Sequence, residues 1–201
     1  MITLTMEQLD AFQEMVNIGI GQAAGVLNAM LNAHVVLHAP VVKIVSQSDL
    51  EEKKLTLKKE MLSAVRIGFK GPFAGNASLM FPTKSAVKLV ILLTEDITDP
   101  QELDSIMVGT LTEVGNIVLN GIMGAIGNEL KERIFYSVPN YVDNPLDVMP
   151  RLDPLTPQNM VVWVETRFEV EEHNIDGYIV MIFESESLGL LVEAIDRVMR
   201  T

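Results

Sequence analysis

Cysteine is absent from the 201-residue sequence. Its absence excludes a disulfide framework, a metal site built from thiolates and a cysteine nucleophile, and it is typical of proteins kept in a reducing cytosol. The first ten residues also lack the basic segment followed by an apolar segment that marks a signal peptide. We therefore expect a cytoplasmic protein.

Positive charge is scarce as well, with 15 Lys and Arg against 27 Asp and Glu, which gives a net charge of −12. Nucleic acid and anionic membranes would repel such a surface, so we expect neither as a partner. Long hydrophobic runs are also missing, since the apolar stretch 87–93 is interrupted by Lys88 and is far too short to span a bilayer. The 48% of hydrophobic residues are instead enough for the core of one compact domain.

Two long helices are predicted. Between residues 6 and 32, apolar residues recur at steps of three and four, which is the pattern of an amphipathic helix. Thr5, Glu7 and Gln8 form a plausible capped start for it. The second helix is predicted over about 99–133, because an Asp-Pro pair followed by Glu at the third helical position is a typical helix start.

The shorter elements follow from alternation, helical periodicity and turn residues. The charged segment 49–60 is interpreted as a solvated turn or strand edge, and the Pro-rich segment 139–157 as irregular. The predicted elements are an extended stretch at 34–45, a hairpin of 61–69 and 74–81, a helix at 84–93, strands at 160–170 and 178–183 with their turn at 174–177, and a closing helix at 187–199, whose buried face is expected to hold Leu190, Leu191, Ile195 and Val198.

The order helix, strands, helix occurs twice, and individual residues recur with it. At an offset of 99 positions, Glu14, Asn17, Ile18, Gly25, Leu31 and Pro40 are matched by Glu113, Asn116, Ile117, Gly124, Leu130 and Pro139. At an offset of 102, Gly75 and Phe81 are matched by Gly177 and Phe183. We expect an α+β fold: one domain, 1–201, made of two repeats of about 1–98 and 99–201. It should be pseudo-two-fold, with a shared, mainly antiparallel sheet, two long motif-bearing helices and two shorter helices.

Polar residues form a stripe on the first long helix. Asp10, Glu14 and Asn17 are spaced four and three residues apart, so they fall within roughly 60° of the helix surface, away from the apolar stripe. Small residues follow, including Gly21, and would let another protein approach closely. The second helix repeats Glu113 and Asn116 and has Gly109 where the first has Asp10. Close packing within the molecule is an equally good explanation for Gly25 and Gly124, because Gly costs a helix about 1 kcal/mol relative to Ala.

A single Glu-x-x-Asn on a helix is usually ordinary surface. Asn is a poor helix former, however, because its amide competes with the backbone, and here it occurs twice at the same distance from Glu and from a later Pro. A carboxamide both donates and accepts hydrogen bonds, which suits it to holding a water in line with a phosphoryl group. The carboxylate is better suited to pair with a lysine of a partner. The sequence offers no ligand set for the metal that such chemistry needs, so the partner must supply it.

The spacing Asp10-x-x-x-Glu14-x-x-Asn17, followed by 22 residues and Pro40, and its second copy ending at Pro139, resembles the CheC/CheX/FliY family of chemotaxis phosphatases. The two-copy form is most similar to CheC. The resemblance implies hydrolysis of the aspartyl-phosphate of a CheY-like response regulator, with Asn17 and Asn116 orienting the attacking water and Glu14 and Glu113 binding the receiver lysine.

Partner contacts are predicted at Asp10, Gly21 and Gly109. Mg²⁺ would be carried by the receiver and no cofactor by this chain. The resemblance further implies a CheD-type deamidase as a second partner. Gly109 departs from the family pattern, so the second site is expected to be the weaker one. We expect a monomer, because the duplication already supplies two sites. Which receiver is the substrate, and whether the pathway is chemotaxis or another two-component system, stay open.

Two other functions fit the same residues. In a non-catalytic CheC-like adaptor the stripes would only dock a receiver or a deamidase. In a flagellar-switch module a further C-terminal domain is expected, and this sequence ends soon after the second repeat. A metal site at His34 and His38 is not expected, because no third ligand lies near them in sequence. A serine hydrolase is not expected either, because no Gly-x-Ser-x-Gly segment is present.

Overall fold

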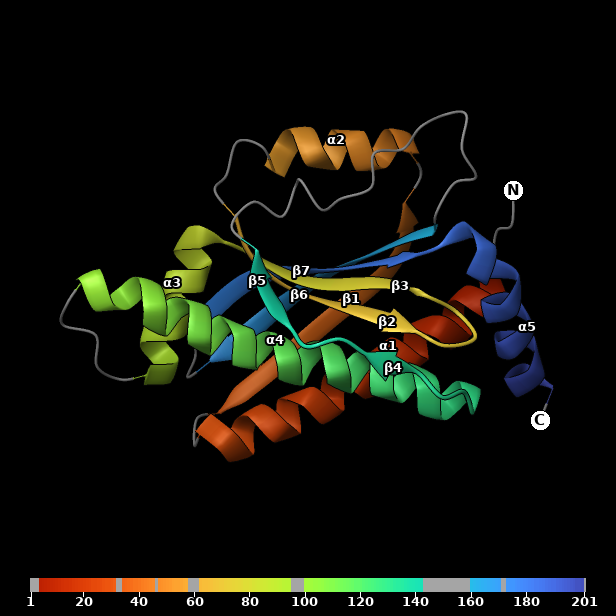
Figure 1. The fold of residues 1–201 in the computed structure, drawn as a ribbon, viewed down its shortest axis with the longest axis horizontal. Helices are drawn as coiled ribbons and strands as arrows, with labels where there is room; N and C mark the ends of the chain where they lie inside the picture. Colours follow the sequence, from red (N-terminus) through yellow and green to blue (C-terminus); the bar gives the residue numbers. More distant parts are fainter. Residues whose placement is uncertain are drawn as a thin grey trace.

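The computed structural model describes residues 4–31, 34–45, 47–57, 62–94, 100–142, 160–170 and 173–200. Helices lie on both faces of a single sheet (Figure 1). The helices are α1 (Met6–Leu31), α2 (Gln47–Leu57), α3 (Thr83–Thr94), α4 (Pro100–Leu130) and α5 (Leu188–Met199), with a 3-10 turn, η2 (Ser185–Ser187), before the last. The strands are β1 (Val35–Val45), β2 (Leu62–Lys70), β3 (Gly75–Pro82), β4 (Phe135–Tyr136), β5 (Asn140–Val142), β6 (Met160–Val170) and β7 (His173–Phe183).

The sheet is antiparallel throughout the described pairings and has the order β1-β6-β7-β3-β2-β4, with β5 also pairing with β2. This order reads the same from both ends once repeats are matched: β1 corresponds to β4 and β5, β6 to β2, and β7 to β3. The predicted α+β fold with a shared antiparallel sheet is therefore confirmed. The division into repeats near residue 98 stays a prediction, because that boundary lies outside the described residues.

The two repeats meet at the β3–β7 pair. Ser78 lies opposite Val180, its own counterpart 102 positions later, so the pseudo-two-fold axis passes through this pair. Gly75 lies opposite Phe183, and a Cβ on Gly177 would be 2.8 Å from the ring of Phe81. Each repeat thus contributes a glycine that makes room at the strand facing the other repeat, which explains why both residue types recur together.

The motif prolines lie at breaks in the two edge strands. β1 pairs with β6 on either side of Pro40, and its register shifts between His38 and Val41. In the second repeat the corresponding edge is split into β4 and β5, and Pro139 lies between them. Proline cannot donate a backbone hydrogen bond, so it is tolerated at edges and irregularities. These two short strands lie within or beside the segment that was predicted to be irregular, and its remainder, 143–159, is outside the described residues.

The predicted capped start of α1 is confirmed by a reciprocal pair of hydrogen bonds. The backbone N–H of Thr5 donates to Gln8 Oε1 at 2.8 Å, and the backbone N–H of Gln8 donates to Thr5 Oγ1 at 3.2 Å. The main core lies between one face of the sheet and helices α1, α3, α4 and α5. Its α1 contribution is the predicted apolar stripe, which includes Phe12, Val16 and Ile20.

Three predictions about shorter elements are wrong. Segment 49–60 is not a turn or strand edge, because residues 47–57 form α2, a third shorter helix where two were expected. Residues 174–177 are not a turn, because β7 begins at His173 and pairs there with Val170. Leu190 is not buried in α5 but 49% exposed, whereas Leu191 and Ile195 are buried as predicted.

α2 covers part of the opposite sheet face. Its Leu50 is fully buried in a second, smaller core with Trp163. Lys53 Nζ donates to Glu165 Oε1 at 3.2 Å and lies 4.6 Å from the centre of the Trp163 ring. A helix anchored by one leucine and one lysine has almost no apolar periodicity, and this explains why the sequence did not predict it.

α4 is long and apolar enough over 105–130 to cross a membrane by length and composition, with a mean hydropathy of 1.4. Core packing accounts for much of that apolar character, since Leu111, Val118 and Ile122 are buried in the main core. This finding therefore gives little support to a membrane span.

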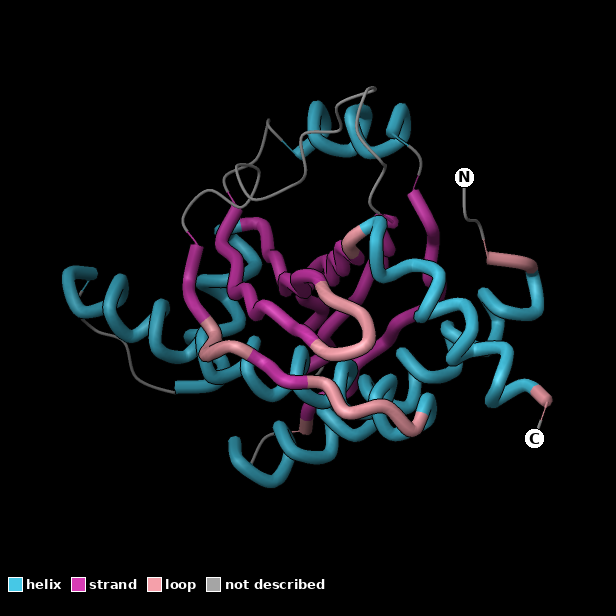
Figure 2. Tube along the Cα trace, turned by 45° about the vertical axis from the view of Figure 1, so that its right-hand side comes forward, coloured by secondary structure: helices cyan, strands magenta, loops and turns pink. Residues whose placement is uncertain are grey.

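α1 and α4 touch backbone to backbone where they cross. A Cβ on Gly19 would collide with Ile122 Cα and lie 2.8 Å from Gly121 O. Gly121 in turn faces Gly19 O and Ala23, at 3.0 and 3.1 Å from its would-be Cβ. Both helices are thereby held on the same side of the sheet, as Figure 2 also shows.

We expect Gly19→Ala to lower the free energy of unfolding by roughly 1–3 kcal/mol, because the added methyl group meets rigid backbone. Gly25→Ala is the matched control on the same helix, since no atom lies within 4 Å of its would-be Cβ. It should raise stability by about 0.5–1 kcal/mol through helix propensity alone. Urea unfolding followed by circular dichroism measures both, and equal effects of the two changes would contradict the packing assignment.

Candidate functional site

The first strip consists of Asp10, Glu14, Asn17 and Gly21 on α1. Asp10, Glu14 and Gly21 are exposed, and Asn17 is partly exposed. Phe12, Met15 and Val16, which alternate with them along the chain, are buried. Helical geometry thus separates the two sets as predicted, and the strip faces away from the main core.

The second strip consists of Gly109, Glu113, Asn116 and Asn120 on α4. Gly109 and Glu113 are exposed, and both asparagines are partly exposed. The buried neighbours of this strip are Leu111, Val114 and Val118. The predicted Glu and Asn residues of both repeats therefore lie on solvent-facing surfaces of two helices that pack side by side. The roles assigned to these residues stay predictions, because the fold does not test them.

The glycines on these helices fall into two groups. Those at the crossing and against the sheet are required by packing, since a Cβ on Gly115 would lie 2.5 Å from the Val65 side chain. The others have no atom within 4 Å of a would-be Cβ in the described part of the chain: Gly21, Gly25, Gly109 and Gly124. Packing within the molecule therefore does not explain Gly25 or Gly124. Because these four glycines have no side chain, a partner could approach the backbone of both helices closely beside the strips.

Asn120 is a strip residue that the sequence analysis missed. Its Nδ2 donates to Asn116 Oδ1 at 2.6 Å, one helical turn back along α4. Its own Oδ1 is buried and has no hydrogen-bond partner among the described residues. The counterpart of Asn120 in the first repeat is Gly21, so the signal in the sequence was a difference between repeats rather than a repeat.

The strips carry two kinds of chemical group. Glu14 and Glu113 present carboxylates, and Asn17 and Asn116 present carboxamides, at matching positions and without a strong nucleophile beside them. Such a set can hold a water molecule through its amides and pair with a cation of a partner through its carboxylates. Within the described ranges no group of three His, Cys, Asp or Glu side chains could hold a metal ion. Chemistry on a phosphoryl group at these strips would need the partner's cation.

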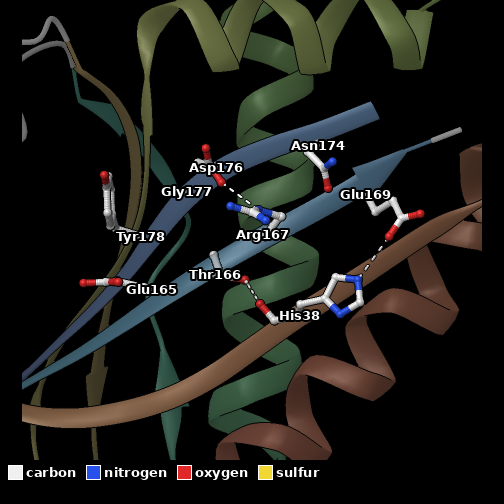
Figure 3. Close-up of a pocket in the computed structure, with 9 residues that line it drawn as sticks. All are labelled: His38, Glu165, Thr166, Arg167, Glu169, Asn174, Asp176, Gly177 and Tyr178. Carbon is white, nitrogen blue, oxygen red and sulfur yellow. Dashed lines mark hydrogen bonds and ion pairs between the residues drawn. The ribbon is translucent and has the colours of Figure 1, made fainter. Parts of the chain in front are cut away.

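A cavity of about 550 Å³ lies on the opposite face of the sheet, over β1, β6 and β7 (Figure 3). Each of its two basic side chains is paired with an acidic side chain of the lining. Arg167 Nε donates to Asp176 Oδ1 at 2.8 Å, and His38 Nε2 lies 3.2 Å from Glu169 Oε2. Both pairs are largely exposed, and such pairs contribute little stability. The cavity is remote from both strips and shows no unpaired cation that would attract a phosphoryl group.

Comparison with known proteins connects this geometry to chemotaxis. Residues 63–147 match the family model described as chemotaxis phosphatase CheX. The matched segment contains Glu113, Asn116 and Pro139, which belong to the second motif, whereas the first motif lies outside it.

Solved structures with the same fold span nearly the whole chain. FliY of Thermotoga maritima superposes with a TM-score of 0.72 at 20% identity, covering 98% of this chain and 100% of that one. FliM of H. pylori, solved in complex with SpeE, gives 0.69 at 11% identity over 97% of both chains. CheX of Borrelia burgdorferi, solved in complex with CheY, beryllofluoride and magnesium, gives 0.56 at 15% identity over 86% of this chain and 97% of that one. The family model confirms, for residues 63–147, the resemblance to the CheC/CheX/FliY chemotaxis family that the motifs predict, and the chain shares the fold of FliY over nearly its whole length.

Proposed function

We propose that this protein is a phosphatase that hydrolyses the aspartyl-phosphate of a CheY-like receiver domain. The observation that carries the proposal is the duplicated Glu-x-x-Asn motif, which lies on solvent-facing surfaces of two packed helices, beside glycines that no internal contact requires. Asn in the middle of a helix costs stability, and keeping it twice at one offset from an exposed Glu favours a function over ordinary surface.

The comparisons support a receiver partner in a coarser way. The CheX family model includes the second motif, and a CheX of the same fold was solved with CheY and magnesium. A receiver that carries magnesium would supply the cation that the strips lack, since the strips offer only carboxylates and amides. Magnesium on the receiver would neutralise phosphoryl charge that a protein of net charge −12 would otherwise repel.

In the proposed reaction, the carboxamide of Asn17 or Asn116 holds a water in line with the bond to be broken. The water oxygen forms a new bond to phosphorus while the bond between phosphorus and the receiver's aspartyl oxygen breaks, and that bonding pair returns to the carboxylate. Both water hydrogens stay with the phosphate, so the products are an aspartate carboxylate and dihydrogen phosphate. The amide contributes position rather than a proton, because it is neither an acid nor a base near neutral pH.

Glu14 and Glu113 would act in docking. A carboxylate placed directly at the phosphoryl group would be repelled by it, but one helical turn away it can accept a hydrogen bond from a receiver lysine. Such a contact fixes the register between helix and receiver and so places the amide over the phosphorus. Partner contacts at Asp10, Gly21 and Gly109 belong to the same proposal.

A docking module is the second candidate, and the whole-chain likeness to FliM, which was solved in complex with another protein, favours it. In that case the strips bind a receiver, or a CheD-type deamidase, without changing the lifetime of the phosphate. The two functions separate on one measurement, because only the first predicts faster phosphate release. The CheD-type partner, the monomeric state and the cytoplasmic location remain predictions.

We expect the protein to accelerate phosphate release from a magnesium-bound, aspartyl-phosphorylated receiver. Asn17→Ala and Asn116→Ala should each remove one site, and the double variant should lower the rate by roughly 10²-fold or more, the usual effect of removing a group that stabilises the transition state. Receiver affinity should change little, because the glutamates remain. Release is followed with a phosphate-binding fluorescent sensor, and affinity by titration of the receiver carrying a stable phosphoryl analogue.

Gln22→Ala is the matched control, because Gln22 is an exposed amide on α1 outside the strip. Both alanine changes at the strips should leave the fold intact, since the helices gain propensity. Unchanged phosphate release in the wild type, together with firm receiver binding, would identify a docking module instead. Loss of phosphate release in Gln22→Ala would show that the assay responds to disturbance of α1 in general rather than to the strip amides.

We expect the charge-neutralising double variant Glu14→Gln, Glu113→Gln to raise KM about tenfold, because each site loses a charge-assisted hydrogen bond of roughly 1.5 kcal/mol. The rise in KM should shrink at high salt, since ions screen the same attraction in the wild type. Glu129→Gln on α4 is the control, because Glu129 is exposed on the other side of that helix. A fall in kcat at constant KM would assign the glutamates to the chemical step rather than to docking.

A further inference from the structure

We propose that Asn120 is a positioning residue for the second site, which fixes the carboxamide of Asn116 in one orientation, and that the first site lacks this device. The inference rests on the proposed function and deepens it, because it says how the two sites differ. It depends on the described contacts of α4 and on the mismatch between repeats.

The hydrogen bond between the two amides is short and local. Asn120 Nδ2 donates to Asn116 Oδ1 at 2.6 Å, across one helical turn. Asn120 is eleven residues after Gly109, which by helical geometry places it about 20° from it, in the middle of the strip. The residue is therefore part of the same surface as Glu113 and Asn116 rather than of the core stripe.

Packing alone does not account for Asn120. Its Oδ1 is buried and unpartnered among the described residues, which costs free energy that an alanine would avoid. Asn also has a lower helix propensity than Ala. Among the described residues, the hydrogen bond that offsets these costs is the one to Asn116. In the first repeat the same position is Gly21, and no atom of the described residues lies within 4 Å of its would-be Cβ, so the described fold does not require a side chain there.

The hydrogen bond to Asn120 restricts the rotation of the Asn116 carboxamide. A free carboxamide turns about its last bond and presents oxygen or nitrogen outward with similar ease. In the pair, one oxygen lone pair of Asn116 is occupied, which leaves its second lone pair and its NH₂ group with fixed directions. If the oxygen and nitrogen of both amides are exchanged, one bond between them remains, so the orientation is fixed in either assignment. A water held by Asn116 therefore has a defined position before the receiver arrives.

Asn17 has no such partner in the described chain, because Gly21 offers no side chain. Its carboxamide stays free to rotate in the docked complex and must lose that freedom as the transition state forms, so the loss adds to the barrier of the chemical step. The second site should then have the higher kcat, although Gly109 replaces the carboxylate of Asp10 there. This reverses the ranking that the sequence alone predicts.

The loss-of-function test uses Asn120→Leu in a protein whose first site is inactivated by Asn17→Ala. Leucine has nearly the same size and makes no hydrogen bond. We expect kcat for phosphate release from the phosphorylated receiver to fall about tenfold, equivalent to about 1.4 kcal/mol. KM and receiver affinity should stay the same, because the glutamate contact is untouched. A merely structural role would instead change the unfolding midpoint and KM together.

The gain-of-function test uses Gly21→Asn in a protein whose second site is inactivated by Asn116→Ala. The open space at Gly21 accepts the new side chain, and its amide should bond to Asn17 as Asn120 bonds to Asn116. We expect kcat of the first site to rise about five- to tenfold, about 1–1.4 kcal/mol. This variant keeps the inference testable even if Asn120→Leu disturbs folding.

The outcomes separate the inference from the proposed function. If Asn116→Ala lowers release in the Asn17→Ala background, while Asn120→Leu and Gly21→Asn leave kcat unchanged, the second site is catalytic and Asn120 does not position it. If Asn116→Ala has no effect in that background, the second site is not catalytic, and if Asn17→Ala alone also leaves phosphate release unchanged, the phosphatase proposal itself fails. If both Asn120→Leu and Gly21→Asn shift kcat in the expected directions, the positioning role stands.

Discussion

The contact between the backbones of α1 and α4 determines where everything else in this protein can lie. Gly19 and Gly121 let the two helices approach until a single added carbon would overlap the opposite backbone. At that separation both helices pack on one face of the sheet (Figure 2). A larger residue at the crossing would force the helices apart and change the angle between the two strips.

The pseudo-two-fold symmetry that relates the two repeats is also present in the sheet. The β3–β7 pair brings Ser78 opposite its counterpart Val180, and a glycine of each repeat lies against the other repeat: Gly177 against the Phe81 ring and Gly75 against the backbone of Ile182. Neither repeat can complete its half of the sheet alone, because β6 and β7 of the second repeat lie between β1 and β3 of the first. The repeats are therefore interleaved in one sheet rather than joined end to end, which makes the relative position of the strips a property of the whole fold.

Much of this could be predicted from the sequence, for physical reasons that differ between elements. The long helices were predictable because their apolar stripes have helical period, and Glu14, Asn17 and their copies stood out because duplication repeats what selection retains. α2 was not predictable, since it is held by Leu50 and by Lys53 over Trp163, which are contacts with a distant strand. Gly177 suggested a turn, but it is a strand glycine that accommodates the Phe81 ring, and only the sheet register reveals this.

The sequence did not predict a role for Asn120, for a different reason. A search for repeats finds what two halves share, and Asn120 is one of the places where they differ. The strips carry equivalent Glu and Asn residues in the middle but differ at both ends: Asp10 against Gly109 at the N-terminal end, and Gly21 against Asn120 at the C-terminal end. Each strip therefore has one additional polar side chain, and the two additions are of different chemistry. An acidic end strengthens attraction to a partner, whereas a second amide restricts the first. Because the two strips are encoded by different segments of one chain, a substitution in one strip leaves the other unchanged, whereas two copies of an identical subunit always change together.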